Sequence, residues 1–170
     1  MMKRTSLTQE ELKKHLHYNQ RTGLFTWKTR RKAIAVGDVA GDFTGRYVRI
    51  KFNQKSYPAS CLAWLWMTGE WPKHEVDHKD TDKHNNRWKN LRAATRKQNT
   101  YNTRPIRNKK YTALKGVSYA KSRTGKNKWV AAIKVDGRNR LVGYFDSAER
   151  AHKAYCFVAK ELRGEFARVA

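Results

Sequence analysis

The sequence predicts an α+β fold: an N-terminal region of a helix and β-hairpins, a basic linker, and a three-stranded antiparallel sheet packed on one helix. Three observations predict it. The chain has 170 residues, enough for one domain or two small ones. Helical and strand periodicities alternate through its N-terminal part, whereas the last 55 residues give three strands followed by one amphipathic helix. Six Trp and eight Tyr are typical of a folded chain.

The first predicted element is a capped helix. Thr8 and Glu11 form a capping box, and Leu7 and Leu12 have the spacing of a hydrophobic staple. We expect Gly23 to end this helix after the polar stretch "NQRTG". The following "LFTWK" reads as a short strand.

A hairpin and a second helix follow. Residues 47–52, "YVRIKF", alternate between apolar and polar side chains, which predicts a half-buried strand, and "NQ" then turns the chain back into "KSY". Residues 58–69, "PASCLAWLWMTG", predict a helix with Pro58 in its first turn and Gly69 at its end. Its large apolar residues fall on one side, as expected of a core-facing helix: Leu62, Leu65 and Trp66.

The C-terminal part changes pattern. "KGVSYAK", "KWVAAIKV" and "RLVGYF" predict three strands, the last two joined by a "DG" turn. Ser147 caps the helix that follows, and Gly164 stands just past its end. We expect its apolar stripe to consist of Ala151, Ala154, Tyr155, Val158 and Leu162. One helix covers one face of such a sheet, so the other face is left bare for a partner.

Composition indicates a polyanionic partner. The chain has 38 Lys plus Arg and 14 Asp plus Glu, a formal net charge of +24, and a pI near 10.4. Residues 83–135 contain sixteen Lys or Arg and no acidic residue, which indicates a surface that meets phosphates. The sequence has no apolar run of the roughly 20 residues that a membrane span needs, and no signal peptide is expected. Two distant cysteines suit reduced thiols of an intracellular protein.

Residues 75–86, "EVDHKDTDKHNN", concentrate four acids and two histidines in this basic chain. The segment is either a solvated turn or a place where a cation is held. Carboxylate and amide oxygens are hard ligands that favour Mg²⁺ or Mn²⁺, and a neutral imidazole can activate a water. Asp77 and His78, followed by Asn90 and Asn99, therefore form a candidate site for cutting a phosphodiester.

The spacing in "VDHKDTDKHNNRWKNLRAATRKQN" resembles the ββα-metal core of the HNH endonucleases, specifically the phage and intron-encoded homing type. The resemblance extends upstream through "YPASCLAWLWMTGEWPKHE", over residues 6–102. It implies that Asp77 and Asn99 are metal ligands for Mg²⁺ or Mn²⁺, and that His78 is the general base. It also implies that Asn90 holds the loop and imidazole of that base. Asp80, Asp82 and His84 fall in the variable loop of the family and are expected to be solvated.

Residues 114–169 resemble the Apetala-two/ethylene-response-factor DNA-binding domain, in which a three-stranded sheet docks in the major groove. The resemblance and strand alternation together give the expected DNA-binding residues: Lys115, Ser118, Arg123, Lys128, Lys134, Arg138 and Arg140. Register on the third strand stays open, so Arg138 and Arg140 depend on it. Several Arg positions of the plant domains are Ser or Ala here, which favours phosphate binding over base reading.

These resemblances divide the chain into an HNH endonuclease domain at 1–102 with its core at about 73–102, a basic linker at 103–113, and an Apetala-two-like domain at 114–170. They imply a metal-dependent endonuclease acting on double-stranded DNA, monomeric or dimeric, phage-encoded and cytoplasmic in a bacterial host. A non-catalytic DNA-binding regulator that kept the fold is the alternative, and an RNA-binding or structural nucleic-acid protein is the third possibility.

Overall fold

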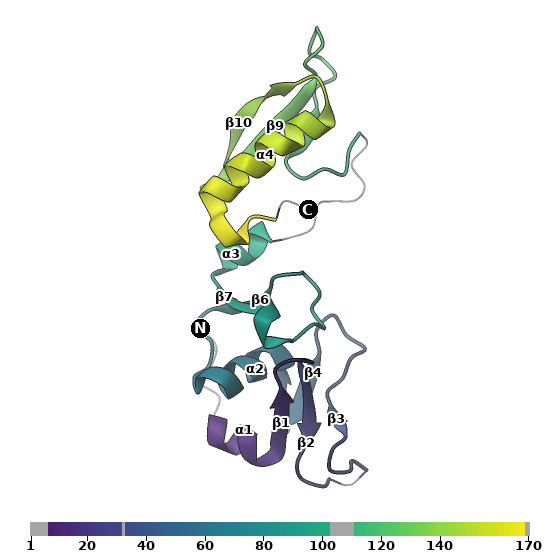
Figure 1. Cartoon of the computed structure of the whole chain (residues 1–170), viewed down its shortest axis with the longest axis vertical. Helices are drawn as coiled ribbons and strands as arrows, with labels where there is room; N and C mark the ends of the chain where they lie inside the picture. The colour runs from purple at the N-terminus through teal and green to yellow at the C-terminus, as the bar shows by residue number, and fades with distance from the viewer. Residues whose placement is uncertain (1–6, 32, 103–110, 169–170) are drawn as a thin grey trace. The chain divides into compact units, whose positions relative to one another are not determined.

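The computed structural model describes residues 7–31, 33–102 and 111–168 (Figure 1). The chain forms two compact units, residues 1–96 and 97–170, each of which is described by itself. Residues 103–110 of the predicted basic linker lie outside the described residues. The boundary between the units falls six residues before the predicted end of the HNH region, and the predicted domain limits stay predictions.

The first helix, α1, spans Gln9–His15 and begins as expected, with the amide of Glu11 donating to the Thr8 hydroxyl at 3.2 Å. It ends earlier than predicted. The next residues form the strand β1 (Leu16–Asn19), whose buried and exposed side chains alternate. Leu16 and Tyr18 are thus buried by strand periodicity, and the turn at "NQRTG" closes a hairpin rather than a helix.

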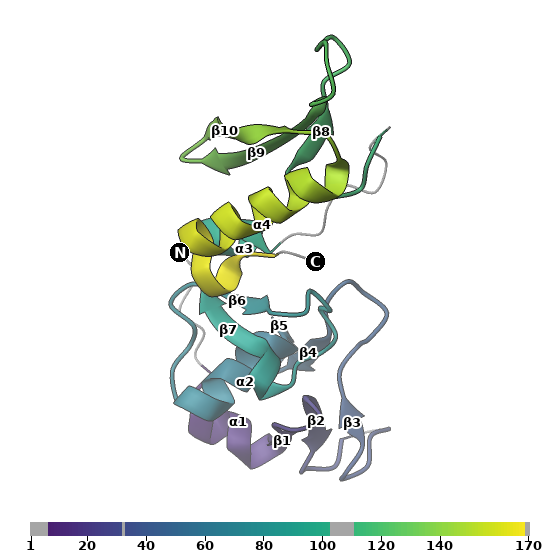
Figure 2. The same cartoon turned by 45° about the horizontal axis from the view of Figure 1, so that its top comes forward.

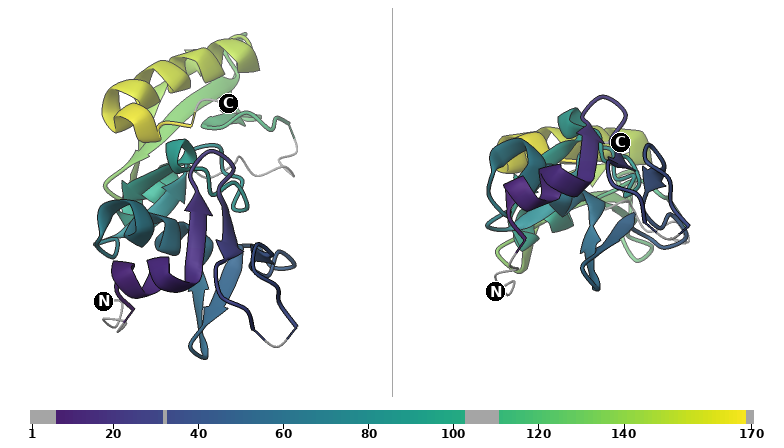
Figure 3. Two further views of the ribbon diagram at one scale, coloured as in Figure 1. Left: turned by 60° about the horizontal axis from the view of Figure 1, so that its bottom comes forward. Right: turned by 90° about the horizontal axis from the view of Figure 1, so that it is seen from below.

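The β1–β2 hairpin continues from α1, as Figure 3 shows. Strand β2 spans Leu24–Trp27, as predicted, and pairs with β1 in antiparallel register. A short strand β3, Val39–Ala40, adds to the other side of β2, giving the order β1-β2-β3. Phe25, in the middle of this sheet, is 1% exposed and packs in the core of the first unit.

The second hairpin and α2 complete that core. Strands β4 (Arg49–Phe52) and β5 (Lys55–Pro58) are joined by Asn53 and Gln54, both at positive φ, as the predicted two-residue turn requires. The helix α2, Ala59–Thr68, ends at Gly69 in the left-handed region. Its inward side chains and those of β4 meet in one cluster: Ile50, Phe52, Leu62 and Leu65.

The segment with the candidate residues forms a small antiparallel sheet and a helix. Strand β6 spans Glu75–His78, the single 3₁₀ turn η1 spans Trp88–Asn90, and strand β7 spans Leu91–Ala94. The short helix α3, Arg96–Tyr101, follows directly. This matches the expected hairpin running into a helix, although all of α3 beyond Arg96 belongs to the second unit.

In the second unit, strands β8 (Val117–Tyr119), β9 (Trp129–Val135) and β10 (Arg138–Phe145) form a sheet in the order β10-β9-β8. The helix α4, Ala148–Arg163, runs across one face of this sheet, as Figure 2 shows. The short 3₁₀ turn η2, Gly164–Phe166, ends the helix. The predicted sheet-and-helix arrangement is confirmed.

The buried stripe of α4 differs in part from the prediction. Ala151 and Tyr155 are buried as expected, together with Ala148 and Ala159. Leu162, which was expected in the stripe, is 56% exposed. The helix continues the stripe from Tyr155 to Ala159 at a spacing of four residues, which turns position 162 toward solvent.

The α+β fold class is confirmed, with helices and small antiparallel sheets in both units. Across the described ranges, no helix combines the length and the apolar character that crossing a membrane would require.

Candidate active site

Two predicted site residues end the strand β6. Asp77 pairs with Arg92 across the β6–β7 register, and His78 pairs with Leu91. Both Asp77 and His78 are 0% exposed. Successive residues of a strand point to opposite faces, so the carboxylate and the imidazole leave the strand on different sides.

The Asp77 carboxylate is paired with a cation from the opposite strand. Nε and Nη2 of Arg92 both donate to its Oδ2, at 3.0 and 2.8 Å, and Arg92 is itself 9% exposed. The ammonium of Lys83 lies 3.8 Å from the other oxygen, Oδ1. Two cations therefore lie beside a carboxylate that water does not reach.

The His78 imidazole is oriented by Asn86. Nε2 of His78 and Oδ1 of Asn86 are 3.0 Å apart, and the Nδ2 of Asn86 donates to the carbonyl of His84. That second bond turns Oδ1 toward the ring, so Nε2 carries the proton and Nδ1 keeps the lone pair of the neutral ring. Burial lowers the pKa of His78, more than the bond to Asn86 raises it. The imidazole is therefore neutral at pH 7 and able to accept a proton at Nδ1.

Asn86 was not predicted from the sequence as a site residue. It is 3% exposed, and its backbone carbonyl accepts a hydrogen bond of 2.6 Å from the Tyr18 hydroxyl of β1. The amide of Trp88 donates to the carbonyl of Gln20 nearby. The β1–β2 hairpin thus supports the segment that orients the imidazole. The sequence offers two adjacent Asn residues, seven and eight positions after His78, and nothing in it marks which one is buried.

Asn90 holds the loop that follows His78. Its Nδ2 donates to Oδ1 of Asp80 and to the carbonyl of Asn85, at 2.9 and 2.7 Å, and its Oδ1 accepts from the amide of Asp80. The side chain is 8% exposed. The part of the expectation that concerns the loop therefore agrees with the geometry. The imidazole contact expected of Asn90 is made by Asn86 instead, because both the Oδ1 and the Nδ2 of Asn90 form hydrogen bonds to loop residues.

The three loop residues expected to be solvated are exposed, but they have structural contacts. Partial burial acts to raise the pKa of Asp80, but hydrogen bonds from Asn85, Asn90 and the Asp82 amide hold that pKa below its ordinary value. Oδ1 of Asp82 accepts from the amide of His84. Nε2 of His84 lies 2.8 Å from the carbonyl of Gly45.

Asn99, the second predicted metal ligand, lies on α3 and is half-buried. It belongs to the second compact unit, whereas the other candidate residues belong to the first. The structure therefore brings Asp77, His78 and Asn90 together, and the pairing of Asn99 with Asp77 stays a prediction.

Comparison with known proteins bears on this segment. Residues 57–101 match the family model of the HNH endonucleases. A protein of Acanthamoeba polyphaga mimivirus, described as an uncharacterized HNH endonuclease, is 36% identical over 92 residues. That alignment covers 54% of this chain, which spans only 44% of the length of the viral protein. No solved structure matches the chain.

These matches support an HNH endonuclease-type region that contains all four predicted site residues, Asp77, His78, Asn90 and Asn99. The family match ends at residue 101, before the C-terminal sheet. The likeness of residues 114–169 to the Apetala-two domain has no support from the comparisons and stays a prediction.

Among the predicted DNA-binding residues, Lys115 is half-buried and precedes β8. Its Nζ donates to the carbonyl of Tyr101 at 2.6 Å. Burial, together with the smaller effect of the charges of Arg163 and Arg168, lowers the pKa of Lys115 to about 8. The ammonium is engaged within the second unit rather than held out to solvent.

The strand register divides the other residues between the two faces of the sheet. Ser118 pairs with Val130, which stands on the face away from α4, and Lys134 is exposed on that same face. The guanidinium of Arg123 lies 3.7 Å above the Tyr144 ring, which also belongs to this face. Lys128 is half-buried just before β9.

Arg138 and Arg140 take the opposite register. They pair with Val135 and Ile133, whose side chains pack toward α4. Both arginines are exposed at the edge strand β10. On β10 it is Asn139, Leu141 and Tyr144 that stand on the face away from the helix. The register that the sequence left open thus separates these two arginines from Lys134.

Proposed function

We propose that this protein is a metal-dependent endonuclease that hydrolyses phosphodiester bonds of double-stranded DNA. One observation carries the proposal: a neutral, buried imidazole with a fixed tautomer follows a buried carboxylate, inside the segment that matches the HNH endonuclease family. The net charge of +24 supports a polyanionic substrate. The homing type is part of the proposal and rests on sequence resemblance.

In this proposal His78 is the general base. Nδ1 takes the proton of the attacking water while Nε2–H stays bonded to Asn86, which stabilises the imidazolium as it forms. Asn90 keeps the loop after His78 in place through Asp80 and Asn85. The proton passes to a ring whose orientation is already fixed, so little reorganisation accompanies the step. By resemblance to the family, the products carry a 3′-hydroxyl and a 5′-phosphate.

Asp77 and Asn99 would supply oxygen ligands for Mg²⁺ or Mn²⁺. Among the described residues there is no cluster of three or more His, Cys, Asp or Glu suited to a metal, so a site here relies on few protein ligands. Mg²⁺ accepts such a set, because waters and substrate phosphates complete its octahedron. When bound, the ion would stabilise charge on the phosphate and on the leaving oxygen. Arg92 would hold Oδ2 of Asp77 and so direct Oδ1 toward the ion.

Substrate access is a further requirement of this proposal. Asp77 and His78 are both 0% exposed. Lys83 lies beside the carboxylate, and the ring of Tyr47 lies 6.5 Å from that of His78. Binding of DNA must shift such side chains before water and a phosphate reach the site. Lys83 is well suited to this change, because a phosphate can replace the carboxylate as its partner.

The second unit would add a DNA-docking surface. The sheet face away from α4 carries Ser118, Lys134 and the Arg123–Tyr144 stack, in agreement with the Apetala-two resemblance. The cations Arg123 and Lys134 on this face suit contact with phosphates. The mimivirus relative supports a viral origin for the chain. A monomeric state and action in the cytoplasm of a bacterial host stay predictions.

A plasmid-nicking assay tests the function. With Mg²⁺ or Mn²⁺ the protein is expected to nick supercoiled DNA, and EDTA is expected to abolish nicking. His78→Ala should lower the rate by roughly 10²- to 10⁴-fold and leave gel-shift affinity unchanged, since the basic surfaces remain. His84→Ala, in the same loop, serves as the matched control and should cut normally. Asn99→Ala should raise the metal concentration needed.

A non-catalytic DNA-binding regulator is the alternative function. The regulator hypothesis predicts tight binding to DNA with no nicking at any metal concentration. That result would overturn the proposal of an endonuclease. Full activity of Asp77→Ala at low Mg²⁺ would overturn the metal site alone. Activity of His78→Ala together with loss in His84→Ala would reverse the roles given to these two histidines.

A further inference from the structure

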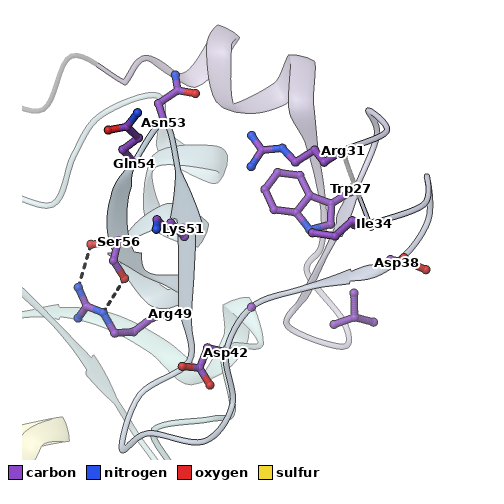
Figure 4. A pocket seen from close by; sticks show the side chains of 12 residues that line it. Trp27, Arg31, Ile34, Asp38, Asp42, Arg49, Lys51, Asn53, Gln54 and Ser56 are labelled. Atoms are coloured by element: carbon purple, nitrogen blue, oxygen red, sulfur yellow. Dashed lines mark hydrogen bonds between the residues drawn. The ribbon is translucent and has the colours of Figure 1, made fainter.

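A basic groove lies in the first unit, beside the β4–β5 hairpin. Arg49 and Lys51 alternate along β4 with the buried Ile50 and Phe52, so the two cations project from the face that turns away from the core. The groove between this face and the segment from Trp27 to Asp42 has a volume of about 860 Å³. Figure 4 shows Arg49 and Lys51 on one wall and Arg31 with Trp27 on the other.

Aromatic packing presents Arg31 to this groove. Its guanidinium lies 4.0 Å from the centre of the Trp27 ring and 5.3 Å from that of Phe52. The Trp27 side chain is only 5% exposed, so the indole serves as a platform for the arginine and not for an incoming base. A stacked guanidinium keeps its N–H edge directed outward, where it can bind a phosphate by two hydrogen bonds.

Three cations (Arg31, Arg49 and Lys51) and two carboxylates line the groove, so a net positive charge remains. Asp38 accepts a hydrogen bond from the amide of Ala35, and Asp42 accepts two from Thr44, so both carboxylates serve local turns. Arg49 donates to Ser56 on the paired strand. Within the part of the chain that the structure describes, neither Arg31 nor Lys51 forms an ion pair.

The groove runs toward the candidate active site. Asp42 and Arg49 form a β-bridge at one end of it, and the loop 43–47 follows directly. This loop touches the segment after His78: the carbonyl of Gly45 is 2.8 Å from Nε2 of His84, and Lys83 lies 5.9 Å from the Tyr47 ring centre. Cations thus continue from Lys51 through Arg49 to Lys83 beside the buried carboxylate of the site.

We propose that this groove binds the sugar–phosphate backbone of duplex DNA next to the bond that is cut. The inference rests on the proposed endonuclease function and names a contact surface for its substrate. Charge complementarity and continuity with the site support a phosphate backbone as the occupant. Single-stranded nucleic acid is disfavoured, because stacking of free bases needs exposed rings, and here arginine covers the indole.

The test uses the full chain and a fluorescent DNA duplex, with affinity measured in EDTA at a series of salt concentrations. The slope of log affinity against log salt concentration should become shallower by about 0.9 for each lost phosphate contact. Lys51→Ala and Arg31→Ala should each show this change, and the double variant should lose about 1.8. Lys55→Ala is the matched control. Lys55 is an exposed lysine of the same hairpin, and it pairs with Phe52 rather than with the outward residues of β4.

A slope for Lys51→Ala equal to that of wild type or of Lys55→Ala would overturn the groove proposal. Arg31 packs on two core rings, so Arg31→Ala can also lower the melting temperature. In that case the salt slope of Lys51→Ala decides the test. Lys51→Arg is expected to restore the slope of the wild type. Tighter binding to single strands than to duplex would also overturn it. The measurement needs no cleavage, so it distinguishes failure of the groove from failure of the endonuclease, which nicking with Mg²⁺ tests separately.

Discussion

Nε and Nη2 of Arg92 both bind Oδ2 of Asp77, and the two residues stand directly opposite each other in the β6–β7 pair. A fully buried carboxylate is costly unless a cation with matching geometry satisfies it. Arg92 provides this from the neighbouring strand, and Lys83 adds a weaker contact at 3.8 Å. The pair therefore links the stability of the small sheet to the charge of a predicted metal ligand.

Replacing Arg92 should destabilise the protein strongly. In Arg92→Ala, the Asp77 carboxylate stays buried but loses the guanidinium, while the Lys83 ammonium lies 3.8 Å from Oδ1. We expect the free energy of unfolding to fall by about 3 kcal/mol. Arg87→Ala removes an exposed arginine nearby and should change stability by less than about 0.5 kcal/mol. Denaturant unfolding of both variants measures the difference. Equal stabilities would mean that the pair contributes little.

Asn86 should control the rate of cleavage and not the affinity for DNA. Asn86→Ala removes the acceptor that fixes Nε2–H of His78, so the ring can rotate or change tautomer. We expect a nicking rate about tenfold to a hundredfold lower, as for a misplaced reacting group, with the same gel-shift affinity. A change in ¹⁵N chemical shifts of the His78 ring would report the tautomer directly. His84→Ala, whose ring contacts Gly45, should show none of these changes.

Lys115 predicts a pH dependence in the second unit. Burial lowers its pKa to about 8 from an ordinary value of 10.5. Between these values the unfolded chain binds more protons than the folded one, so stability rises with pH across that window. Lys115→Met should therefore stabilise this unit at pH 7, on the order of 1 kcal/mol after allowing for partial exposure, and less so at pH 10.5. Hydrogen exchange of residues 114–168 measures it; a pH-independent difference would contradict it.

Gly23 should tolerate no side chain. It has a φ of +77°, and a Cβ there would overlap the backbone of Asn86 and Arg87. Gly23→Ala should cost about 1–3 kcal/mol from backbone strain alone, with the overlap adding to it. Gly37→Ala is the control, since Gly37 also has a positive φ but open space around it. Unfolding and nicking assays on both variants distinguish backbone strain from displacement of the Asn86 segment. Only Gly23→Ala should lose nicking activity.

Much of the fold followed from local patterns. The capped start of α1, the β4–β5 hairpin with its two-residue turn, α2 ending at Gly69, and the C-terminal sheet with α4 all have strong periodicity or turn residues. The end of α1 did not follow from the sequence. Polar residues on either side of Leu16 and Tyr18 suit a helix as well as a strand, and pairing with β2 decides between them.

The site was predicted less completely. Asp77, His78 and Asn90 could be named from their spacing, but Asn86 could not, because its role depends on burial beneath Tyr18 from a distant hairpin. Similarly, Lys115 looks in the sequence like any surface lysine, although its ammonium is bound to the Tyr101 carbonyl. Such contacts join residues far apart in the chain, and no local pattern encodes them.

The support of Asn86 and Trp88 by the β1–β2 hairpin has a consequence for the evolution of the segment 57–101. Each of its two hydrogen bonds, Tyr18 to Asn86 and Trp88 to Gln20, joins residues 68 positions apart. The segment 57–101 is thus not independent of the rest of the unit, since transferring it to another protein without the β1–β2 hairpin would remove the support of the Asn86 segment that orients His78. Contacts of this span also form late, because a long loop must close first. Substitutions at the hairpin turn and around Asn86 should therefore compensate one another in evolution.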